Sequence, residues 1–359
     1  MNRYYFTPGP SQLEPGIEIY FRRALQNGIL STYHRSEAFS NLYRKIHKLC
    51  QEKLQLPASY SLYFFSSATE CWSVLSESVV QAKSLHICNG AFAQKWAYYA
   101  GNLHPIEKIS IEALEEKDHI LPLTDLLCIT LNETSNGSFF PFSLLAKIRG
   151  NLPNQLIALD VTSCLGGIEI PWELGDFWFG SVQKCLGLPS GLALFFASPA
   201  AVERINTQRK SNLQYNSLFA VHQNFLKYQT THTPNILNIF LLSEVLENRQ
   251  SIESISKDTY YWASCFYKVL ASLPELELCQ PNPLFQSPTI ITCTAREATI
   301  KQLHEYLLLQ HNIVIGQGYG KDCATSFRIA NFPQMPPTCK AQLIEILVDF
   351  FGKKFLNGG

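Results

Sequence analysis

One lysine stands in an otherwise apolar and glycine-rich stretch of the sequence. Lys184 lies in FGSVQKCLGLPSGLALFF (179–196), with Gln183 before it and Gly187 and Gly191 after it. Burying a lysine is costly unless its amine is used or neutralised. An apolar setting also lowers the pKa of the amine, which can then attack an aldehyde. The stretch therefore predicts a nucleophilic lysine.

Two further features are expected to lie near this lysine. Asp160 ends the apolar run LIALD, and Ser67, Ala68 and Thr69 follow the apolar run SLYFF at the start of a helical pattern. In an open α/β sheet such positions lie at the carboxyl ends of strands, where ligands bind. A helix N-terminus with small residues can hold an anion. Taken alone, Ser67 or Thr69 is better explained as an ordinary helix cap, and a lone Asp as an acceptor for turn amides.

Together, an amine, a carboxylate and an anion cradle match the needs of pyridoxal 5′-phosphate. The cradle would take the phosphate, Asp160 would keep the pyridinium nitrogen protonated, and Lys184 would form the Schiff base. The three features together are far more specific than any one of them. The combination predicts an enzyme that uses this cofactor.

The elements that must position these residues follow from the hydrophobic pattern. Strands are expected at 61–65, 84–88, 126–131, 156–160, 176–180 and 192–197, with helices after the first two. This alternation predicts βαβ units and a mostly parallel sheet flanked by helices, hence an α/β fold. Later helical patterns and short strands predict a smaller α+β domain. We expect a large domain over 15–240 and a small one over 241–359 that includes residues 1–14, with the linker near 230–245.

Composition excludes several classes of function. The 359 residues hold 29 Lys plus Arg against 29 Asp plus Glu, so no net charge points to nucleic acid or an acidic membrane. Eleven cysteines form no CxxC pair, and the nine histidines form no HExxH pattern, which argues against a metal site. The N-terminus has no apolar core of a signal peptide, and no apolar run is long enough to span a membrane. We expect a cytoplasmic protein with reduced thiols.

The motifs resemble those of the class V (fold type I) pyridoxal-phosphate aminotransferases, and within them the phosphoserine aminotransferase branch. The most specific match is SVQKCLGLPSG, which is similar to the family's lysine segment with its Gln-Lys pair. Matches in the same order run from FTPGP to SFRIANF and include YHRSEAF (33–39), NETSNG (132–137), ALDVTSCLGG (158–167) and THTPN (231–235).

The resemblance implies a role for each matching residue. Lys184 would form the Schiff base and shuttle the proton, Asp160 would pair with the ring nitrogen, and Gln183 would bond the side of the ring that carries the 3-hydroxyl. The other cofactor contacts implied are Ser67, Ala68 and Thr69 at the phosphate, Phe92 stacked on the ring, Thr134 beside it, and His232 and Thr233 reaching the phosphate from the partner subunit. This last pair implies a homodimer with shared sites.

The residues implied to bind substrate leave its identity open. Arg328 matches the arginine that binds the α-carboxylate, although a structural ion pair would also explain it. His34 and Arg35 match a pair that reaches the substrate's phosphate from the neighbouring subunit, or they could cap a surface turn.

One stretch departs from the pattern. Bacterial phosphoserine aminotransferases carry a second His-Arg pair where this chain has Lys321 and Asp322. Lys321 could attract a phosphate, but Asp322 would oppose it, and the stretch looks more like the alanine–glyoxylate and serine–glyoxylate branch. Our expectation is ping-pong transamination between phosphoserine and 2-oxoglutarate in serine biosynthesis, with the glyoxylate branch as the alternative.

A lyase such as a cysteine desulfurase is the rival from another class of function. Such enzymes usually have His before the lysine, whereas this chain has Gln183. Their nucleophilic cysteine would correspond best to Cys323. A non-catalytic relative is disfavoured because no expected residue is missing.

Overall fold

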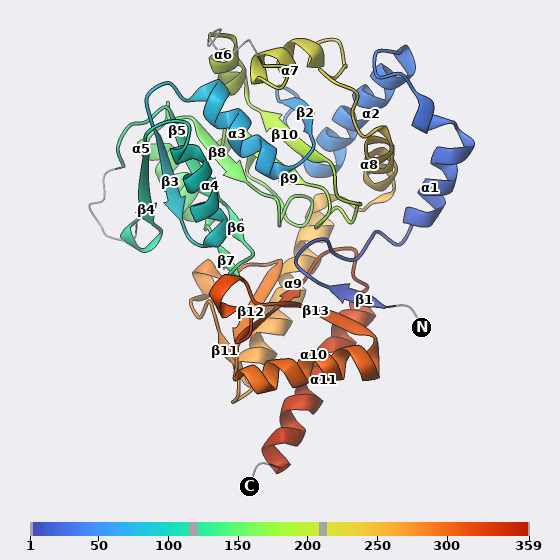
Figure 1. The fold of residues 1–359 in the computed structure, drawn as a ribbon, viewed down its shortest axis with the longest axis vertical. Helices are drawn as coiled ribbons and strands as arrows, with labels where there is room; N and C mark the ends of the chain where they lie inside the picture. The colour runs from blue at the N-terminus through green and yellow to red at the C-terminus, as the bar shows by residue number, and fades with distance from the viewer. Residues whose placement is uncertain (1–2, 115–120, 208–213, 358–359) are drawn as a thin grey trace.

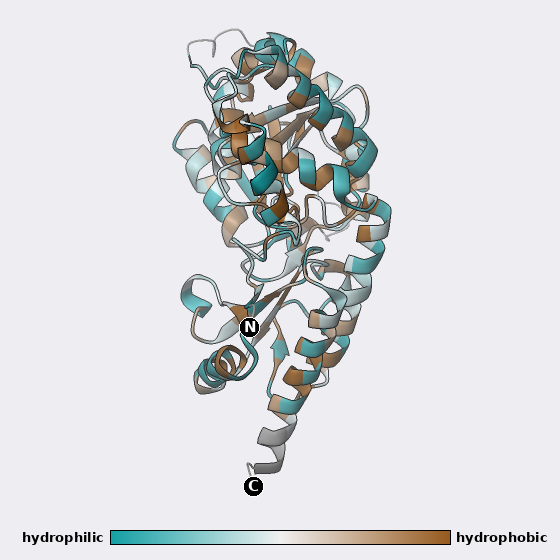
Figure 2. Cartoon of the chain, turned by 90° about the vertical axis from the view of Figure 1, so that its right-hand side faces the viewer, coloured by the Kyte–Doolittle hydropathy of each residue, from teal (hydrophilic) through white to brown (hydrophobic). Residues whose placement is uncertain are grey.

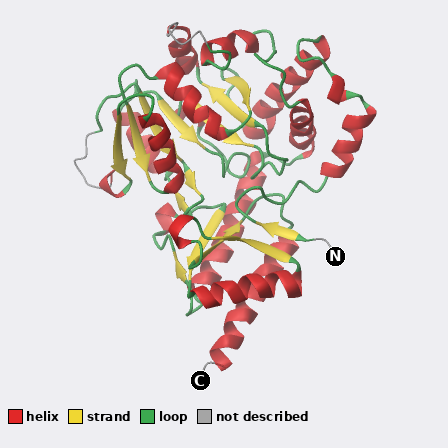
Figure 3. Cartoon of the chain, in the orientation of Figure 1, coloured by secondary structure: helices red, strands yellow, loops and turns green. Residues whose placement is uncertain are grey.

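The computed structural model describes residues 3–114, 121–207 and 214–357 of the chain. Two main sheets lie one above the other in Figure 1, and helices surround both, as Figure 3 shows in red. The upper sheet is built from the middle of the chain. The lower sheet combines the N-terminal strand with strands from the last third.

The upper sheet has seven strands and confirms the expected α/β fold with a mostly parallel sheet. Its spatial order is β2 (Ser61–Phe65), β10 (Ala193–Ala197), β9 (Phe177–Ser181), β8 (Ile157–Asp160), β5 (Leu126–Thr130), β3 (Ser84–Cys88) and β4 (Ile106–Ser110). Strand β10 runs antiparallel to both of its neighbours, and every other neighbouring pair is parallel. The carboxyl ends of β8 and β9 therefore meet at one edge, where Asp160 and the lysine segment emerge.

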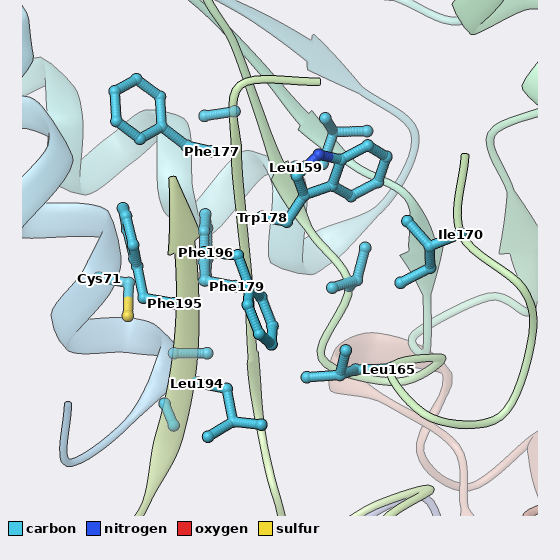
Figure 4. Packing of buried hydrophobic residues seen from close by; sticks show 14 of the residues in the cluster. Cys71, Leu159, Leu165, Ile170, Phe177, Trp178, Phe179, Leu194, Phe195 and Phe196 are labelled. Carbon is cyan, nitrogen blue, oxygen red and sulfur yellow. The ribbon is translucent and has the colours of Figure 1, made fainter. Parts of the chain in front are cut away.

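Aromatic side chains fill the centre of this sheet. Phe177, Phe179, Phe195 and Phe196 are fully buried, and Figure 4 shows them packed with Trp178. Each such side chain contributes about 1.5–3 kcal/mol when it leaves water. Because both faces of β9 and β10 are covered, their sequences are continuously apolar rather than alternating. The lysine segment thus follows a tightly packed strand.

Among the described residues, eight helices belong to the part of the chain that surrounds the upper sheet. They are α1 (Ile17–Gln26), α2 (Glu37–Leu54), α3 (Ala68–Val79), α4 (Ala91–Gly101), α5 (Phe142–Asn151), α6 (Pro199–Thr207), α7 (Leu218–Phe225) and α8 (Ile236–Asn248), with 3₁₀ turns at Ile29–Ser31, Glu112–Leu114 and Trp172–Leu174. Several begin at a side-chain cap, such as Ser36 before α2 and Ser67 before α3, whose oxygens accept backbone N–H bonds.

The lower sheet has five strands and a core of its own. Its order is β1 (Tyr4–Phe6), β13 (Ile313–Gln317), β14 (Ser326–Ala330), β12 (Ile290–Thr294) and β11 (Glu277–Leu278). The accompanying elements are α9 (Ile252–Ala271), α10 (Glu297–His311) and α11 (Pro337–Asn357), with 3₁₀ turns at Pro283–Phe285 and Gly320–Asp322. A separate two-stranded pair, β6 (Asn132–Glu133) and β7 (Ser138–Phe139), follows β5, and its Phe139 belongs to the core of the upper sheet. Figure 2 shows α11 running down to the C-terminus, with apolar and polar residues mixed along the helices.

The expected division of the chain at residue 240 falls inside helix α8. This helix packs on α1 and α2, and its side chains Leu242 and Leu246 belong to the core of the upper sheet. Phe266 of α9 lies in the core of the lower sheet. A helix that is packed along its whole length is not a linker, so we propose the boundary between α8 and α9, near residues 249–251.

None of the helices in the described part of the chain has the length and hydrophobicity needed to span a membrane.

Candidate active site

Lys184 lies three residues beyond the end of β9 and is partly buried. Its Nζ is 5.7 Å from the centre of the Phe92 ring. Gly9 packs closely against the side chain of Lys184: a Cβ at position 9 would stand 2.9 Å from Cε of the lysine. Burial lowers the pKa of the Lys184 amine, and the charges of Asp160 and Glu133 partly oppose this shift. The amine is thereby brought closer to the neutral, nucleophilic form.

Asp160 ends β8 and is buried. Its carboxylate accepts hydrogen bonds from Nε1 of Trp72 at 3.0 Å and from the backbone N–H of Thr162 at 2.9 Å. Burial raises the pKa of Asp160, while these hydrogen bonds and the charge of Lys184 act in the opposite direction. The carboxylate is held rigidly at the edge where the lysine segment also lies.

The expected anion cradle lies at the N-terminus of α3. Ser67 accepts from the backbone N–H of Glu70 at 3.1 Å and so caps the helix, while its hydroxyl proton can still be donated. The N–H of Ala68 donates to Oγ of Ser181 at 2.9 Å, which ties the helix start to the end of β9. Among the described residues the N–H of the exposed Thr69 has no acceptor. The helix dipole favours an anion at this point.

Glu133 is a site residue that sequence reasoning missed. It is fully buried after β5, and its carboxylate accepts the backbone N–H groups of Phe92 at 2.9 Å and Ala93 at 3.1 Å. Ser135 donates to the same carboxylate from its N–H at 3.0 Å and its hydroxyl at 2.8 Å. A Cβ at Gly90 would stand 2.1 Å from Cγ of Glu133, so only glycine fits there. Burial raises the pKa of Glu133, and its hydrogen bonds oppose that shift.

This network fixes the backbone at Phe92, whose ring lies beside the amine of Lys184. An acidic residue directly after a strand end, as in NETSNG, was the available signal for Glu133. Trp72 and Tyr319 were also missed. The ring of Tyr319 lies 5.0 Å from that of Phe92, although Phe92 belongs to α4 beside the upper sheet and Tyr319 to the hairpin between β13 and β14 of the lower sheet.

Gln183 directly precedes Lys184 in the sequence, and Thr134 directly follows Glu133. The side-chain Oε1 of Gln183 is buried and has no hydrogen-bond partner among the described residues. Thr134 is buried, and its carbonyl accepts from Nη1 of Arg328 at 3.1 Å. Both residues thus belong to the group around Lys184, and Gln183 keeps an unsatisfied amide oxygen.

Arg328 reaches this group from the lower sheet. Its Nε donates to the carbonyl of Gln317 at 2.7 Å, and its guanidinium lies 5.6 Å from the ring of Tyr319. Burial lowers the pKa of Arg328, and its charge acts on Lys184. The guanidinium forms no ion pair with any described residue. It remains available to a carboxylate, for which an arginine fork is well suited.

Lys321 is exposed in the hairpin between β13 and β14. It makes no hydrogen bond or ion pair within the described part of the chain, and Asp322 beside it is also exposed. In the described hairpin, Tyr319 contacts Phe92 and Arg328, whereas no hydrogen bond, ion pair or ring contact of the described residues joins Lys321 to the group around Lys184. The structure therefore leaves Lys321 outside that group.

His34, Arg35, His232 and Thr233 form a separate cluster. Nδ1 of His34 lies 3.4 Å from Oγ1 of Thr233, and Nη1 of Arg35 lies 3.4 Å from Oε1 of Gln229. Burial lowers the pKa of His34, and the charges of Arg35 and His232 add to the shift. In the described structure no hydrogen bond or ring contact joins this cluster to Lys184. Within one chain, then, the four residues are together but apart from the lysine.

Comparison with known proteins identifies the family of this chain. The family model "Aminotransferase class-V" matches residues 3–343. The phosphoserine aminotransferase of Corynebacterium glutamicum is 26% identical, with 99% of this chain and 94% of that protein covered. The one from Rhodococcus opacus is 24% identical over 94% of this chain and 92% of its own length.

Solved structures show the same fold. A phosphoserine aminotransferase from Cytophaga hutchinsonii has a TM-score of 0.91 and 30% identity, covering 97% of this chain and 99% of that one. An alanine–glyoxylate aminotransferase from Nostoc has a TM-score of 0.78 and 20% identity, covering 98% and 96%, and shares the fold alone. The family match and the aminotransferase relatives together support the expected transaminase. The chain belongs to the class-V aminotransferase family.

Proposed function

We propose that this chain transfers the amino group of phosphoserine to 2-oxoglutarate, with pyridoxal 5′-phosphate as its cofactor, and serves serine biosynthesis. The observation that carries the proposal is the meeting of Lys184, Asp160 and the N-terminus of α3 at one edge of the upper sheet, with the unpaired Arg328 facing them from the lower one. We further propose a cytoplasmic homodimer.

The residues present fit the cofactor. Within the described part of the chain, three groups lack partners that such a ligand would supply: the buried Oε1 of Gln183, the N–H of Thr69, and the amine of Lys184 with its lowered pKa. Ser67, Ala68 and Thr69 would hold the phosphate, Asp160 the ring nitrogen, Gln183 the side of the 3-hydroxyl, Phe92 one face of the ring and Thr134 its edge, with His232 and Thr233 added by the other subunit. When bound, pyridoxal phosphate withdraws electrons from the substrate's Cα.

The chain's own residues would then bind the substrate and move its proton. Arg328 would hold the α-carboxylate through N–H groups that its bonds to Thr134 and Gln317 leave free. This contact directs Cα toward Nζ of Lys184, whose lowered pKa suits it to accept the α-proton and to return it. Asp160 would keep its charge opposite the ring nitrogen, because Trp72 and Thr162 stabilise the carboxylate. The same residues serve donor and acceptor in turn, as ping-pong kinetics requires.

Phosphoserine is proposed as the donor on two grounds. The relatives with the highest identity above are named phosphoserine aminotransferases. In addition, this cluster offers the guanidinium of Arg35 and the imidazole of His34, a cation and a hydrogen-bonding group that a second subunit could bring to a substrate phosphate. The exposed Lys321 and Asp322 favour the alternative, an alanine–glyoxylate or serine–glyoxylate transaminase, because they supply no ordered phosphate contact.

A substrate panel separates these two functions. The purified enzyme with its cofactor is assayed with phosphoserine, serine, alanine and glutamate as donors, each against 2-oxoglutarate and glyoxylate. We expect kcat/KM for phosphoserine to exceed that for serine by about 100-fold, as a buried charge contact of about 2–3 kcal/mol would give. A preference for serine or alanine with glyoxylate would overturn the phosphoserine proposal and leave the transaminase in place.

A further inference from the structure

Tyr319 contacts one residue from each half of the candidate active site. Its ring centre lies 5.0 Å from that of Phe92, and the two ring planes are inclined by 42°. The guanidinium carbon of Arg328 lies 5.6 Å from the same ring centre of Tyr319. Since Nζ of Lys184 lies 5.7 Å from the ring centre of Phe92, a continuous series of contacts joins the amine of Lys184 to the guanidinium of Arg328.

The hairpin between β13 and β14 fixes the main chain at Tyr319. The N–H of Gly318 donates to the carbonyl of Ser326 at 2.9 Å, and the N–H of Asp322 donates to the carbonyl of Tyr319 at 3.2 Å. Oγ of Ser326 closes the turn by donating to the carbonyl of Asp322 at 2.7 Å. A Cβ at position 318 would collide with that hydroxyl oxygen, so the tight turn requires glycine there. The ring of Tyr319 thus extends from a well-defined backbone.

Phe92 gives this ring a fixed surface to pack on. The backbone N–H of Phe92 donates to the carboxylate of Glu133 at 2.9 Å, a bond in which the hairpin takes no part. The side chains of Phe92 and Tyr319 are both half-buried. Tilted aromatic rings at such a distance attract one another. The position of the Tyr319 ring therefore depends on Phe92, whereas the main chain of Phe92 is held without Tyr319.

Arg328 is held by hydrogen bonds and by this ring. Its Nε donates to the carbonyl of Gln317 at 2.7 Å, and its Nη1 donates to that of Thr134 at 3.1 Å. Its Nη2 has no acceptor among the described residues and so is left for a ligand. An aromatic ring within about 6 Å attracts a cation over its face, and more strongly when the cation is withdrawn from water. Burial, which lowers the pKa of Arg328, provides that condition.

We propose that Tyr319 is a positioning residue for the transamination: its ring, packed on Phe92, holds the guanidinium of Arg328 where it can bind the α-carboxylate of the substrate. This inference rests on the carboxylate contact of the proposed function and applies to any amino-acid donor. The hydroxyl of Tyr319 forms no hydrogen bond within the described part of the chain, so the ring carries the role. Loss of the ring should weaken carboxylate binding and leave proton transfer at Lys184 in place.

Two variants of Tyr319 separate the ring from the hydroxyl. With the amino donor that the purified holoenzyme uses best, Tyr319→Leu should lower kcat/KM by about 10-fold, mainly through a higher KM, because the carboxylate is bound alike before and during the reaction. Tyr319→Phe should recover most of that loss. The matched control is Tyr306→Leu, which removes another half-buried tyrosine beside the core of the lower sheet and should keep the KM of the wild type.

A double-mutant cycle tests whether Tyr319 acts through Arg328. Arg328→Met alone should lower kcat/KM by about 100-fold, and the double variant Tyr319→Leu, Arg328→Met should be no worse than Arg328→Met. Titration of the apoenzymes with pyridoxal phosphate should give Tyr319→Leu the affinity of the wild type, since Phe92 keeps its bond to Glu133.

The possible outcomes separate this inference from the proposed function. A wild-type KM in Tyr319→Leu, an equal loss in Tyr319→Phe, or additive losses in the double variant would overturn the role of Tyr319 and leave the proposed transamination standing. Weaker binding of pyridoxal phosphate to Tyr319→Leu would also overturn it, because the ring would then act through Phe92. If Arg328→Met keeps its full kcat/KM, the carboxylate contact of the proposed function fails, and the role of Tyr319 with it.

Discussion

The carboxylate of Glu133 accepts a hydrogen bond of 2.9 Å from the backbone N–H of Phe92 and so joins the segment that follows β5 to the start of helix α4, which follows the neighbouring strand β3. The N-cap residue of α4, Gly90, has no side chain that could accept a backbone N–H of the first turn. Glu133 takes the place of such a cap from a distant part of the chain. It holds the main chain of Phe92, whose ring centre is 5.7 Å from Nζ of Lys184. A buried acid thus serves the site through position rather than contact with substrate.

Glu133→Gln should destabilise the protein and weaken cofactor binding together. The amide turns an NH₂ group toward the N–H donors of α4, and leaving them unsatisfied costs about 1–3 kcal/mol. Urea unfolding and titration of the apoenzyme with pyridoxal phosphate measure the two effects. The control is Glu297→Gln in the first turn of α10, where the acid is exposed. Equal effects of the two substitutions would contradict the role of Glu133.

Lys184→Met should abolish transamination and leave the fold intact. The methionine keeps the packing against Gly9, and it removes an amine whose charged form is disfavoured by burial. We expect the rate to fall by at least about 1,000-fold, with a free energy of unfolding equal to or above that of the wild type. Keto-acid formation and urea unfolding measure these quantities. Lys147→Met, at an exposed position of α5, should change neither.

Arg328→Met should lower kcat/KM about 100-fold for every amino acid and for the keto-acid acceptor, because both carry the carboxylate that the guanidinium would bind. A primary amine without a carboxylate should be used as well by the variant as by the wild type. Lys321→Met is the control from the same hairpin. If that exposed lysine proves as important as Arg328, the assignment of the carboxylate contact is wrong.

Mixed dimers of two variants test whether sites are shared between subunits. Arg35→Met alone should lose most activity at low phosphoserine, and Lys184→Met alone should be inactive. In a mixed dimer one site regains both Lys184 and the Arg35 of the other subunit, so an equal mixture should recover about one quarter of the wild-type rate. No recovery after subunit exchange would mean that each chain uses its own Arg35.

His86 should make stability depend on pH below neutrality. It is buried in β3 with Nε2 2.9 Å from Oγ of Ser84, and burial lowers its pKa from 6.5 to about 3. Between these values the unfolded chain binds a proton that the folded chain does not, so stability falls as the pH falls, by up to about 1.4 kcal/mol per pH unit. The difference in unfolding free energy between wild type and His86→Gln, measured from pH 7 to pH 5, should shrink accordingly. A constant difference over that range would show that His86 does not titrate in this way.

Patterns among residues adjacent in the sequence determined the secondary structure and the positions of several site residues. The lysine in its glycine-rich segment, the strand that ends at Asp160 and the helix that begins after Ser67 are all legible because each depends on residues adjacent in the chain. The right-handed linkage of strands and helices then brings strand ends to one edge. The sequence could therefore predict an α/β fold with Lys184, Asp160 and an anion cradle together.

The tertiary structure decided which residues far apart in the chain contact one another. Trp72 bonds Asp160, Glu133 bonds Phe92, and Arg328 bonds the carbonyl of Thr134 across 194 residues. The residues that lie against one another across two sheets depend on how the elements pack, which no local period encodes. The same reason places α8 on the upper core and Tyr319 beside both Phe92 and Arg328.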